Sequence, residues 1–313
     1  MKCEVRSDEW AARSAKPPRS VFGNFAARGA AGAQPLSTGH EAKPSPGANE
    51  GEAAVPLQTS IDTAMARAFL YRFLAQAYQD PTADGWAQLT NASCLCDLES
   101  AVRALTTTRP SLAEFVPLIR SQFQEQHFES FLAAYLAAFG HAARGRCPLN
   151  EIEYGDIKAD PLFQPHRLAD IAAFYRAFGL EVTEDADERH DHICLELEFM
   201  CVLAAKEAYA LEHQLDSESL SVCRGAQKRF LREHLGRWAP AFTRRLARMA
   251  ADSPLASLAN FTRAFIEAEC SRFGVPPGSE DLLLRPVDEA AESMCNSCGI
   301  TQLPPGAVPP SAS

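Results

Sequence analysis

The sequence predicts an all-α protein, a globular multi-helix bundle with a charged hinge loop near its middle and disordered termini. Through most of residues 60–273, apolar side chains recur every three or four positions, which is the period of an amphipathic helix. The alternating apolar and polar runs of half-buried strands, bounded by hairpin turns, are missing from the sequence. No repeat of fixed period appears either, so a solenoid is not expected.

The first half of the chain divides into three helical regions. A first helix is expected from Ser60, a suitable N-cap, to the stop at Asp80-Pro81. A second helix is expected over about 86–105, and a third region follows Arg109-Pro110 and stops at Gly140. The buried face of the first helix is marked by apolar residues, namely Ala66, Phe69, Leu70, Phe73, Leu74 and Ala77.

The second half begins with an irregular loop over residues 141–163, which contains acidic residues and a tyrosine. Long ordered loops between helices are often functional. Helices then follow, with Pro240 and Pro254 each expected near a helix start. Their expected ranges are 165–178, 192–214, 217–237, 240–251 and 254–273. The acidic stretch of about 180–192 lies between the expected helices 165–178 and 192–214. It is too charged to pack and is expected to form the hinge.

Composition sets the boundaries of the folded part. Residues 1–57 are rich in Ala, Gly, Pro, Ser and Arg without any period, which predicts a disordered extension. Residues 58–274 form the all-helical domain. Residues 275–313 are expected to be a loose, Pro-rich tail that carries the pair Cys295 and Cys298.

The charge and the cysteines narrow the class of protein. A net charge of −10 makes a nucleic-acid partner unexpected. No apolar run is long enough for a secretory signal or a membrane span. The ten cysteines are scattered, as in a protein with reduced thiols. These features together predict a cytoplasmic protein.

Charge is segregated along the chain. Residues 181–198 hold eight acidic residues and one basic residue, Arg189, whereas residues 224–248 hold eight basic residues and one acidic residue, Glu233. Two interpretations stay open. The two blocks are solvated faces that attract each other, or they form an acidic groove for a basic peptide and a basic face for an acidic partner.

The hinge ends in the stretch Glu188-Arg189-His190-Asp191-His192, directly before a helix. Asp191 is expected to cap that helix, because a helix N-terminus favours negative charge. His192 lies one turn before Glu196 and can pair with it and gain charge. Against this, the same helix end disfavours a cation, so a neutral histidine is the other possibility. The stretch can also be no more than a polar loop between helices.

Two other interpretations, an enzyme site and a metal site, are alternatives to a simple polar loop. His190-Asp191 resembles the metal-binding pair of an HD-type phosphohydrolase, and His166 is available upstream, but no suitable aspartate follows in a helix. Cys295 and Cys298 have zinc-ligand spacing without the second pair that a closed zinc site needs, so they are weak metal candidates. No Gly-rich phosphate loop or nucleophile elbow is present. No cofactor is expected.

Several motifs in order resemble the TorD/DmsD/NarJ family of redox-enzyme maturation chaperones, over about residues 60–273. The hinge motif is Glu188-x-x-Asp191-His192, followed by Leu195-Glu196-Leu197-Glu198-Phe199-Met200. The other motifs are Tyr71-x-x-Leu74-Ala75, Tyr135-x-x-x-Phe139-Gly140, Cys147-Pro148-Leu149-x-Glu151-x-Glu153-Tyr154, Leu168-Ala169-Asp170-Ile171 and Phe174-Tyr175-x-Ala177-Phe178-Gly179. The Cys147 block looks most like the branch that serves type II enzymes of the dimethyl-sulfoxide-reductase family. One departure is Arg189, where the family often has proline.

This resemblance implies a non-catalytic, all-helical, cytoplasmic chaperone. Such proteins bind the catalytic subunit of a molybdenum-containing oxidoreductase, often at its twin-arginine signal peptide, until the molybdenum cofactor is inserted. It implies a monomer or a homodimer that exchanges halves across the hinge. The residues expected to bind the client or shape the hinge are Glu188, Asp191, His192, Glu196, Glu198, Glu151, Glu153, Tyr154, Asp170 and Tyr175.

Overall fold

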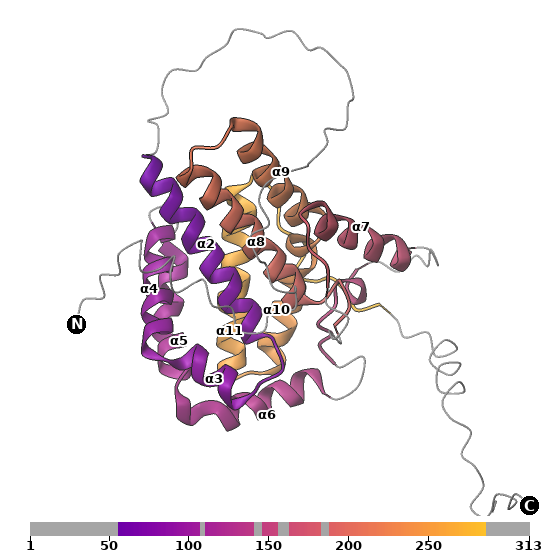
Figure 1. Ribbon diagram of the computed structural model, residues 1–313. Coiled ribbons are helices and arrows are strands. Elements are labelled where there is room, and N and C mark those ends of the chain that lie inside the picture. Colours follow the sequence, from indigo (N-terminus) through magenta and orange to yellow (C-terminus); the bar gives the residue numbers. More distant parts are fainter. Residues whose placement is uncertain (1–55, 107–109, 141–145, 156–162, 183–187, 286–313) are drawn as a thin grey trace, which may run out of the picture.

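The computed structural model of the chain describes residues 56–106, 110–140, 146–155, 163–182 and 188–285 (Figure 1). Within these ranges the regular structure is helical, and the only strand-like pairing consists of isolated bridges. The all-α prediction is therefore confirmed. The α-helices are α2 (Leu57–Ala77), α3 (Ala83–Thr90), α4 (Ala92–Thr106), α5 (Val116–Gln122), α6 (Phe128–Phe139), α7 (Phe163–Ala177), α8 (Ile193–Glu212), α9 (Ser217–Glu233), α10 (Leu235–Met249) and α11 (Pro254–Arg272). Short 3-10 helices are η1 (Pro110–Phe115), η2 (Glu125–His127) and η3 (Glu151–Glu153).

Helices α2 and α8 form the centre of the bundle. They pack against each other, with α4 against α2, α9 against α8, and α10 against α11 (Figure 1). The first two turns of α8 are buried on nearly all sides, because Ile193, Leu195, Leu197 and Met200 are fully enclosed. Burial of this apolar surface is the main favourable term in folding. The hinge motif therefore leads directly into the core.

The predicted helices of the first half were correct in place but too few. The expected helix over 86–105 is two helices, α3 and α4. Thr82 caps α3 by accepting from Gly85 N at 3.1 Å, and Asn91 caps α4 by accepting from Cys94 N at 2.7 Å. A side-chain cap at Asn91 starts a new helix where the apolar period alone suggested continuity. The expected third region is η1, α5, η2 and α6 in turn.

The helices α7, α8 and α11 agree with their predicted ranges to within two residues at each end. The expectation for Pro240 was wrong, since α10 begins at Leu235 and Pro240 lies inside it. A proline there cannot donate to the carbonyl of Gly236. That carbonyl instead accepts from Gly278 N at 2.9 Å. A later segment thus supplies the missing hydrogen bond, which the local pattern could not indicate.

The folded part continues past the boundary expected at 274. Val275 is buried, and Leu284 forms an isolated antiparallel bridge with Tyr154. Gly278 lies so close to α10 that a Cβ would come within 1.9 Å of the Arg237 carbonyl oxygen. Residues 275–285 thus contact α10 and residues 153–155, although most of their side chains are partly or fully exposed. The extension over residues 1–55 and the pair Cys295 and Cys298 lie outside the described residues.

Of the helices in the described ranges, none combines the length and apolar character needed to cross a membrane.

Candidate functional site

Two loops far apart in the sequence meet at the start of α8. The backbone of Asn150 forms an antiparallel bridge with that of His192. Glu151 N donates to the Asp191 carbonyl at 2.9 Å, and Ile193 N donates to the Leu149 carbonyl at 2.9 Å. The loop of residues 146–155, here the middle loop, and the hinge residues 188–192 therefore form one site.

Asp191 holds the two loops together. Its side chain is fully buried and accepts from Asn150 Nδ2 and from Ile152 N, both at 3.1 Å. Arg189 closes the arrangement through two bonds, Nε–Oδ1 at 3.0 Å and Nη2–Oδ2 at 3.1 Å. The expectation that Asp191 caps α8 was wrong, because its oxygens are engaged by the middle loop. The carboxylate that an HD-type site would offer to a metal ion is paired with the Arg189 guanidinium instead.

His192 is the residue that caps α8. Its Nδ1 accepts from Cys194 N at 3.3 Å. Enclosure of the ring lowers the pKa of His192 to about 4, although the nearby Asp191 charge acts in the opposite direction. The neutral form therefore prevails at neutral pH, and it is the form that can accept this bond. The alternative in which a charged His192 pairs with Glu196 was wrong.

Glu196 is fully buried and is bonded to α10 instead. Its Oε2 accepts from Trp238 Nε1 at 3.0 Å, while Oε1 has no hydrogen-bond partner among the described groups. Burial, and then the negative charge of Glu151, raise the pKa of Glu196 well above its usual value. Glu196 therefore lies buried at the base of the site, where its surroundings favour the protonated form more than water does.

Glu151 is the charged centre of the middle loop. It is fully buried and accepts from Arg167 Nε at 2.8 Å and Arg237 Nη2 at 3.0 Å, and its Oε2 lies 3.0 Å from His234 Nδ1. Burial alone would raise the pKa of Glu151, but the His234 hydrogen bond and the two arginines lower it to about 2. This ionised group ties the loop to α7 and α10.

Asp170, Glu233 and His234 are the described residues whose ligand atoms lie close enough together to hold a metal ion. Their contacts favour ion pairing over metal binding. Glu233 is already paired with Arg229 at 2.8 Å and with Arg232 at 2.6 Å. His234 Nε2 lies 3.2 Å from Asp170 Oδ2. A divalent cation would meet two guanidinium groups there, which opposes its binding.

The remaining predicted residues fall into two groups. Tyr175 and Tyr154 are buried and fix backbone positions: Tyr175 donates to the His190 carbonyl and Tyr154 to the Pro148 carbonyl, each at 2.8 Å. Glu188 and Glu198 are only partly buried, and Glu198 Oε1 accepts from Gln79 Nε2 at 3.5 Å. Glu153 lies 3.6 Å from Arg189.

The structure therefore brings most of the predicted residues together, but with a different role. Glu151, Asp191 and Glu196 are each 0% exposed, so these two acids of the 181–198 block, Asp191 and Glu196, do not face a groove for a basic peptide, which was one of the two interpretations left open. They set the shape of the loops from beneath. Within the two loops, the partly exposed acidic side chains are Glu153 and Glu188.

The sequence did not indicate that Arg167 and Arg237 hold the middle loop through Glu151. It also did not indicate a second buried network, which is centred on Arg67. Arg67 is enclosed in the core, where its Nε lies 2.9 and 2.8 Å from the two Glu269 oxygens and its Nη1 lies 2.8 Å from Glu207. It also donates to Gln227. One signal was present: Arg67 is a single charge within the otherwise apolar face of α2.

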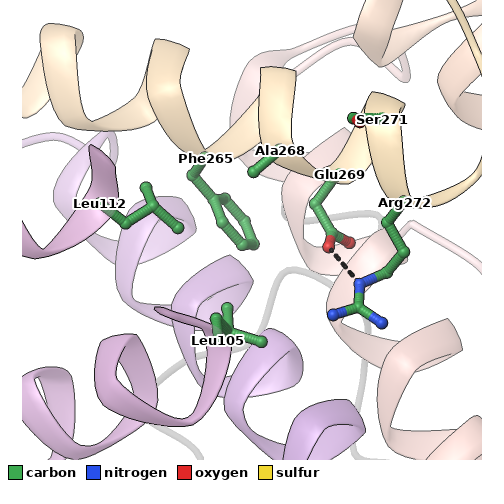
Figure 2. A pocket seen from close by; sticks show the side chains of 7 residues that line it. All are labelled: Leu105, Leu112, Phe265, Ala268, Glu269, Ser271 and Arg272. Atoms are coloured by element: carbon green, nitrogen blue, oxygen red, sulfur yellow. Dashed lines mark ion pairs between the residues drawn. The ribbon is translucent and has the colours of Figure 1, made fainter. Parts of the chain in front are cut away.

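A cavity of about 430 Å³ lies elsewhere, between the end of α4, η1 and α11 (Figure 2). Figure 2 shows apolar walls that include Leu105, Leu112 and Phe265, with the Arg272 side chain turned toward Glu269. Arg272 Nε lies 3.6 Å from Glu269 Oε1. The cavity shares no lining residue with the two loops, and its polar end is already part of the Arg67 network.

Comparison with known proteins agrees with this architecture. Residues 98–244, which include both loops of the site, match the nitrate reductase delta subunit family. The chain is 31% identical to the selenate reductase assembly chaperone protein of Thauera selenatis over 214 residues, which cover 68% of this chain and 93% of that protein. The chain belongs to the TorD/DmsD/NarJ family of redox-enzyme maturation chaperones.

Other proteins similar to this chain are also named as reductase assembly chaperones. The perchlorate reductase assembly chaperone protein of Dechloromonas aromatica is 28% identical, over 66% of this chain and 90% of that protein. The chlorate reductase assembly chaperone protein of Ideonella dechloratans is 28% identical, over 71% of this chain and 96% of that protein. No solved structure matches the chain significantly. The HD-type phosphohydrolase alternative receives no support from these relatives.

Proposed function

We propose that this protein is a cytoplasmic, non-catalytic chaperone that binds the catalytic subunit of a molybdenum-containing oxidoreductase. It holds that subunit until the molybdenum cofactor is inserted, and so delays export. The observation that carries the proposal is the match over 93% of a selenate reductase assembly chaperone. Relatives named for perchlorate and chlorate reductases support the same client class.

The chemistry of the site supports a binding role. Its buried acids are used to position backbone: Asp191 holds Ile152, and Glu151 holds the middle loop against α7 and α10. A loop fixed in advance loses less conformational freedom when a partner binds, which favours affinity. Glu196 is fully buried and bonded to Trp238, so its side chain does not face a partner.

We propose that the part of the client bound by this protein is its twin-arginine signal peptide. Such a peptide has a basic segment followed by an apolar segment. Partly exposed Glu153 and Glu188 are placed to attract the basic segment. Charge attraction between exposed groups speeds encounter more than it strengthens the complex, so the peptide can still be released.

The test is the molybdenum content of the client. The catalytic subunit is purified from the host lacking this gene, from the same host carrying the wild-type gene, and from that host carrying the empty vector. Without the chaperone, the subunit is expected to accumulate without molybdenum and without reductase activity. Wild-type molybdenum content and activity in the deletion host would contradict the proposal.

A further inference from the structure

The last described segment of the chain pairs with the middle loop. Gly155 N donates to the Leu283 carbonyl at 3.0 Å, and Arg285 N donates to the Glu153 carbonyl at 2.9 Å. Between them, Tyr154 and Leu284 form an antiparallel bridge. This is the main-chain pattern by which an extended segment adds to a β-edge. We call residues 279–285 the C-terminal strap.

The side chains of the strap are only partly enclosed. Leu283 is 73% exposed, and Leu282 and Leu284 are partly buried against the core. The acidic side chains of the strap reach Arg244, through Asp281 at 2.6 Å and Glu280 at 3.4 Å, but the Asp281 side chain is 80% exposed. Exposed ion pairs of this kind add little to stability and are screened by salt. Glu280 also lies 3.3 Å from Arg263. Release of the strap therefore breaks exposed ion pairs, the backbone bonds to the edge and the contacts of two partly buried leucines, and it exposes no fully buried side chain of the strap.

The residues directly before the strap are held firmly against α10, so the part of the chain that can leave the edge begins after Gly278. Gly278 N supplies the bond that Pro240 cannot give to the Gly236 carbonyl, and a side chain at 278 would collide with Arg237. Residues up to Gly278 are therefore held against α10. Residues after it are held by the edge pairing and by side chains that are partly or fully exposed.

The strap covers the loop that the hinge controls. The edge residues Glu153, Tyr154 and Gly155 directly follow Ile152, whose N–H is held by Asp191. Glu153 also lies 3.6 Å from Arg189 of the hinge. The edge that the strap occupies is thus part of the site already described, and its position depends on the hinge motif.

The chemistry of the strap indicates what the edge accepts. Its sequence from 282 to 285 is Leu-Leu-Leu-Arg, an apolar run beside a base. A twin-arginine signal peptide contains the same two elements, in the opposite order along the chain. We propose that the edge at residues 153–155 binds the client signal peptide as an extended segment, and that the strap is a built-in competitor which the peptide displaces. This inference rests on the proposed function and names where the peptide binds.

The test compares full-length variants that release the strap with one that does not. The released variant carries Glu280→Gln, Asp281→Asn and Arg285→Pro, which remove the ion pairs with Arg244 and the N–H that reaches Glu153. The matched control is Leu283→Ser, which changes an exposed side chain and keeps the pairing. Circular dichroism and thermal melting verify that both remain folded, which the exposure of these groups predicts.

The probe is a fluorescent synthetic peptide with two adjacent arginines followed by a leucine and alanine run, and binding is followed by anisotropy. In wild type, the strap is paired with the edge in most molecules, so its removal raises the apparent affinity of the edge for the probe. The released variant is therefore expected to bind the probe about tenfold tighter than wild type. The control is expected to bind as wild type does. An unlabelled peptide of residues 279–286 is expected to displace the probe from the released variant.

Equal affinity of all three proteins, or failure of the 279–286 peptide to compete, would overturn the inference. If the full chain still captures the catalytic subunit while the probe binds none of the proteins, the inference fails and the proposed function stands. Failure of the proposed function would appear separately, as normal molybdenum content in the host that lacks the gene.

Discussion

The carboxylate of Asp191 accepts a hydrogen bond from the backbone N–H of Ile152 at 3.1 Å, across 39 residues of chain. The same carboxylate is reached by Asn150 and by Arg189. The family motif at the hinge therefore acts on the middle loop more than on the helix that follows it. This relationship gives a buried acid a part in the proposed client site without contact with the client.

Asp191→Ala is expected to lower the free energy of unfolding by about 1–3 kcal/mol, because it leaves the buried Ile152 N–H without its acceptor. Asp191→Asn retains one acceptor oxygen and is expected to cost less. Urea denaturation of the two variants checks this. A loss below about 0.5 kcal/mol for Asp191→Ala would show that water or backbone movement satisfies the loop instead.

The double change Asp191→Ala and His192→Ala is expected to give a folded, helical protein that does not bind the signal peptide. It removes both the tie to the middle loop and the cap of α8. Binding should fall by more than the stability loss explains, because the loop would no longer be held in position. Circular dichroism beside calorimetric titration tests this, and wild-type affinity would remove the hinge from the site.

Glu151 gives the protein a predictable response to acid. Its folded-state pKa of about 2 lies below the usual value of 4.5, so its ionised form is stabilised by folding. The stability it contributes is present above about pH 4.5 and is lost as the pH falls toward 2. Glu151→Gln should therefore flatten the fall in stability between these values, measured by denaturation at a series of pH values. An unchanged profile would contradict this assignment.

At neutral pH the same variant has a second expected effect. Glu151→Gln leaves Arg167, Arg237 and His234 around a neutral group, and breaking a buried ion pair typically costs about 3–5 kcal/mol. The partial exposure of the two arginines places the expected loss at the lower end of that range. A loss near zero at pH 7 would show that water solvates the Arg167 and Arg237 guanidinium groups in the variant.

Arg67→Ala is expected to destabilise the bundle by about 3–5 kcal/mol, because it removes the buried cation that Glu207 and Glu269 share and leaves them with the more exposed Arg224 and Arg272. The matched control is Arg103→Ala, which breaks the exposed pair with Glu99 and should change stability by no more than about 0.5 kcal/mol. Both are measured by urea denaturation. Similar losses in the two variants would contradict the role assigned to Arg67.

The helices were predictable where apolar period and stop signals agree, as at Gly140 after α6 and Pro254 at the start of α11. The failures have particular causes. Asn91 starts a helix by a local side-chain bond inside an unbroken apolar pattern. Pro240 is tolerated inside α10 because Gly278, distant in sequence, supplies a donor. Both depend on contacts that periodicity does not encode.

The site residues were predictable as a group but not in their roles. Asp191 precedes a helix in the position typical of a cap, and only the folded middle loop shows that its oxygens bond elsewhere. The pairing of Glu151 with Arg167 and His234 joins three separate segments. Sequence spacing carries no information about such contacts, whereas the motif order was enough to indicate the family.

The most direct test of the central claim is capture of the client before cofactor insertion. The tagged full-length protein is expressed with the catalytic subunit in cells that cannot make the molybdenum cofactor, and in matched cells that can. We expect an equimolar complex in the first cells and its loss in the second, where the subunit carries molybdenum. Absence of the complex in cofactor-deficient cells, or equal capture of the loaded subunit, would contradict the account.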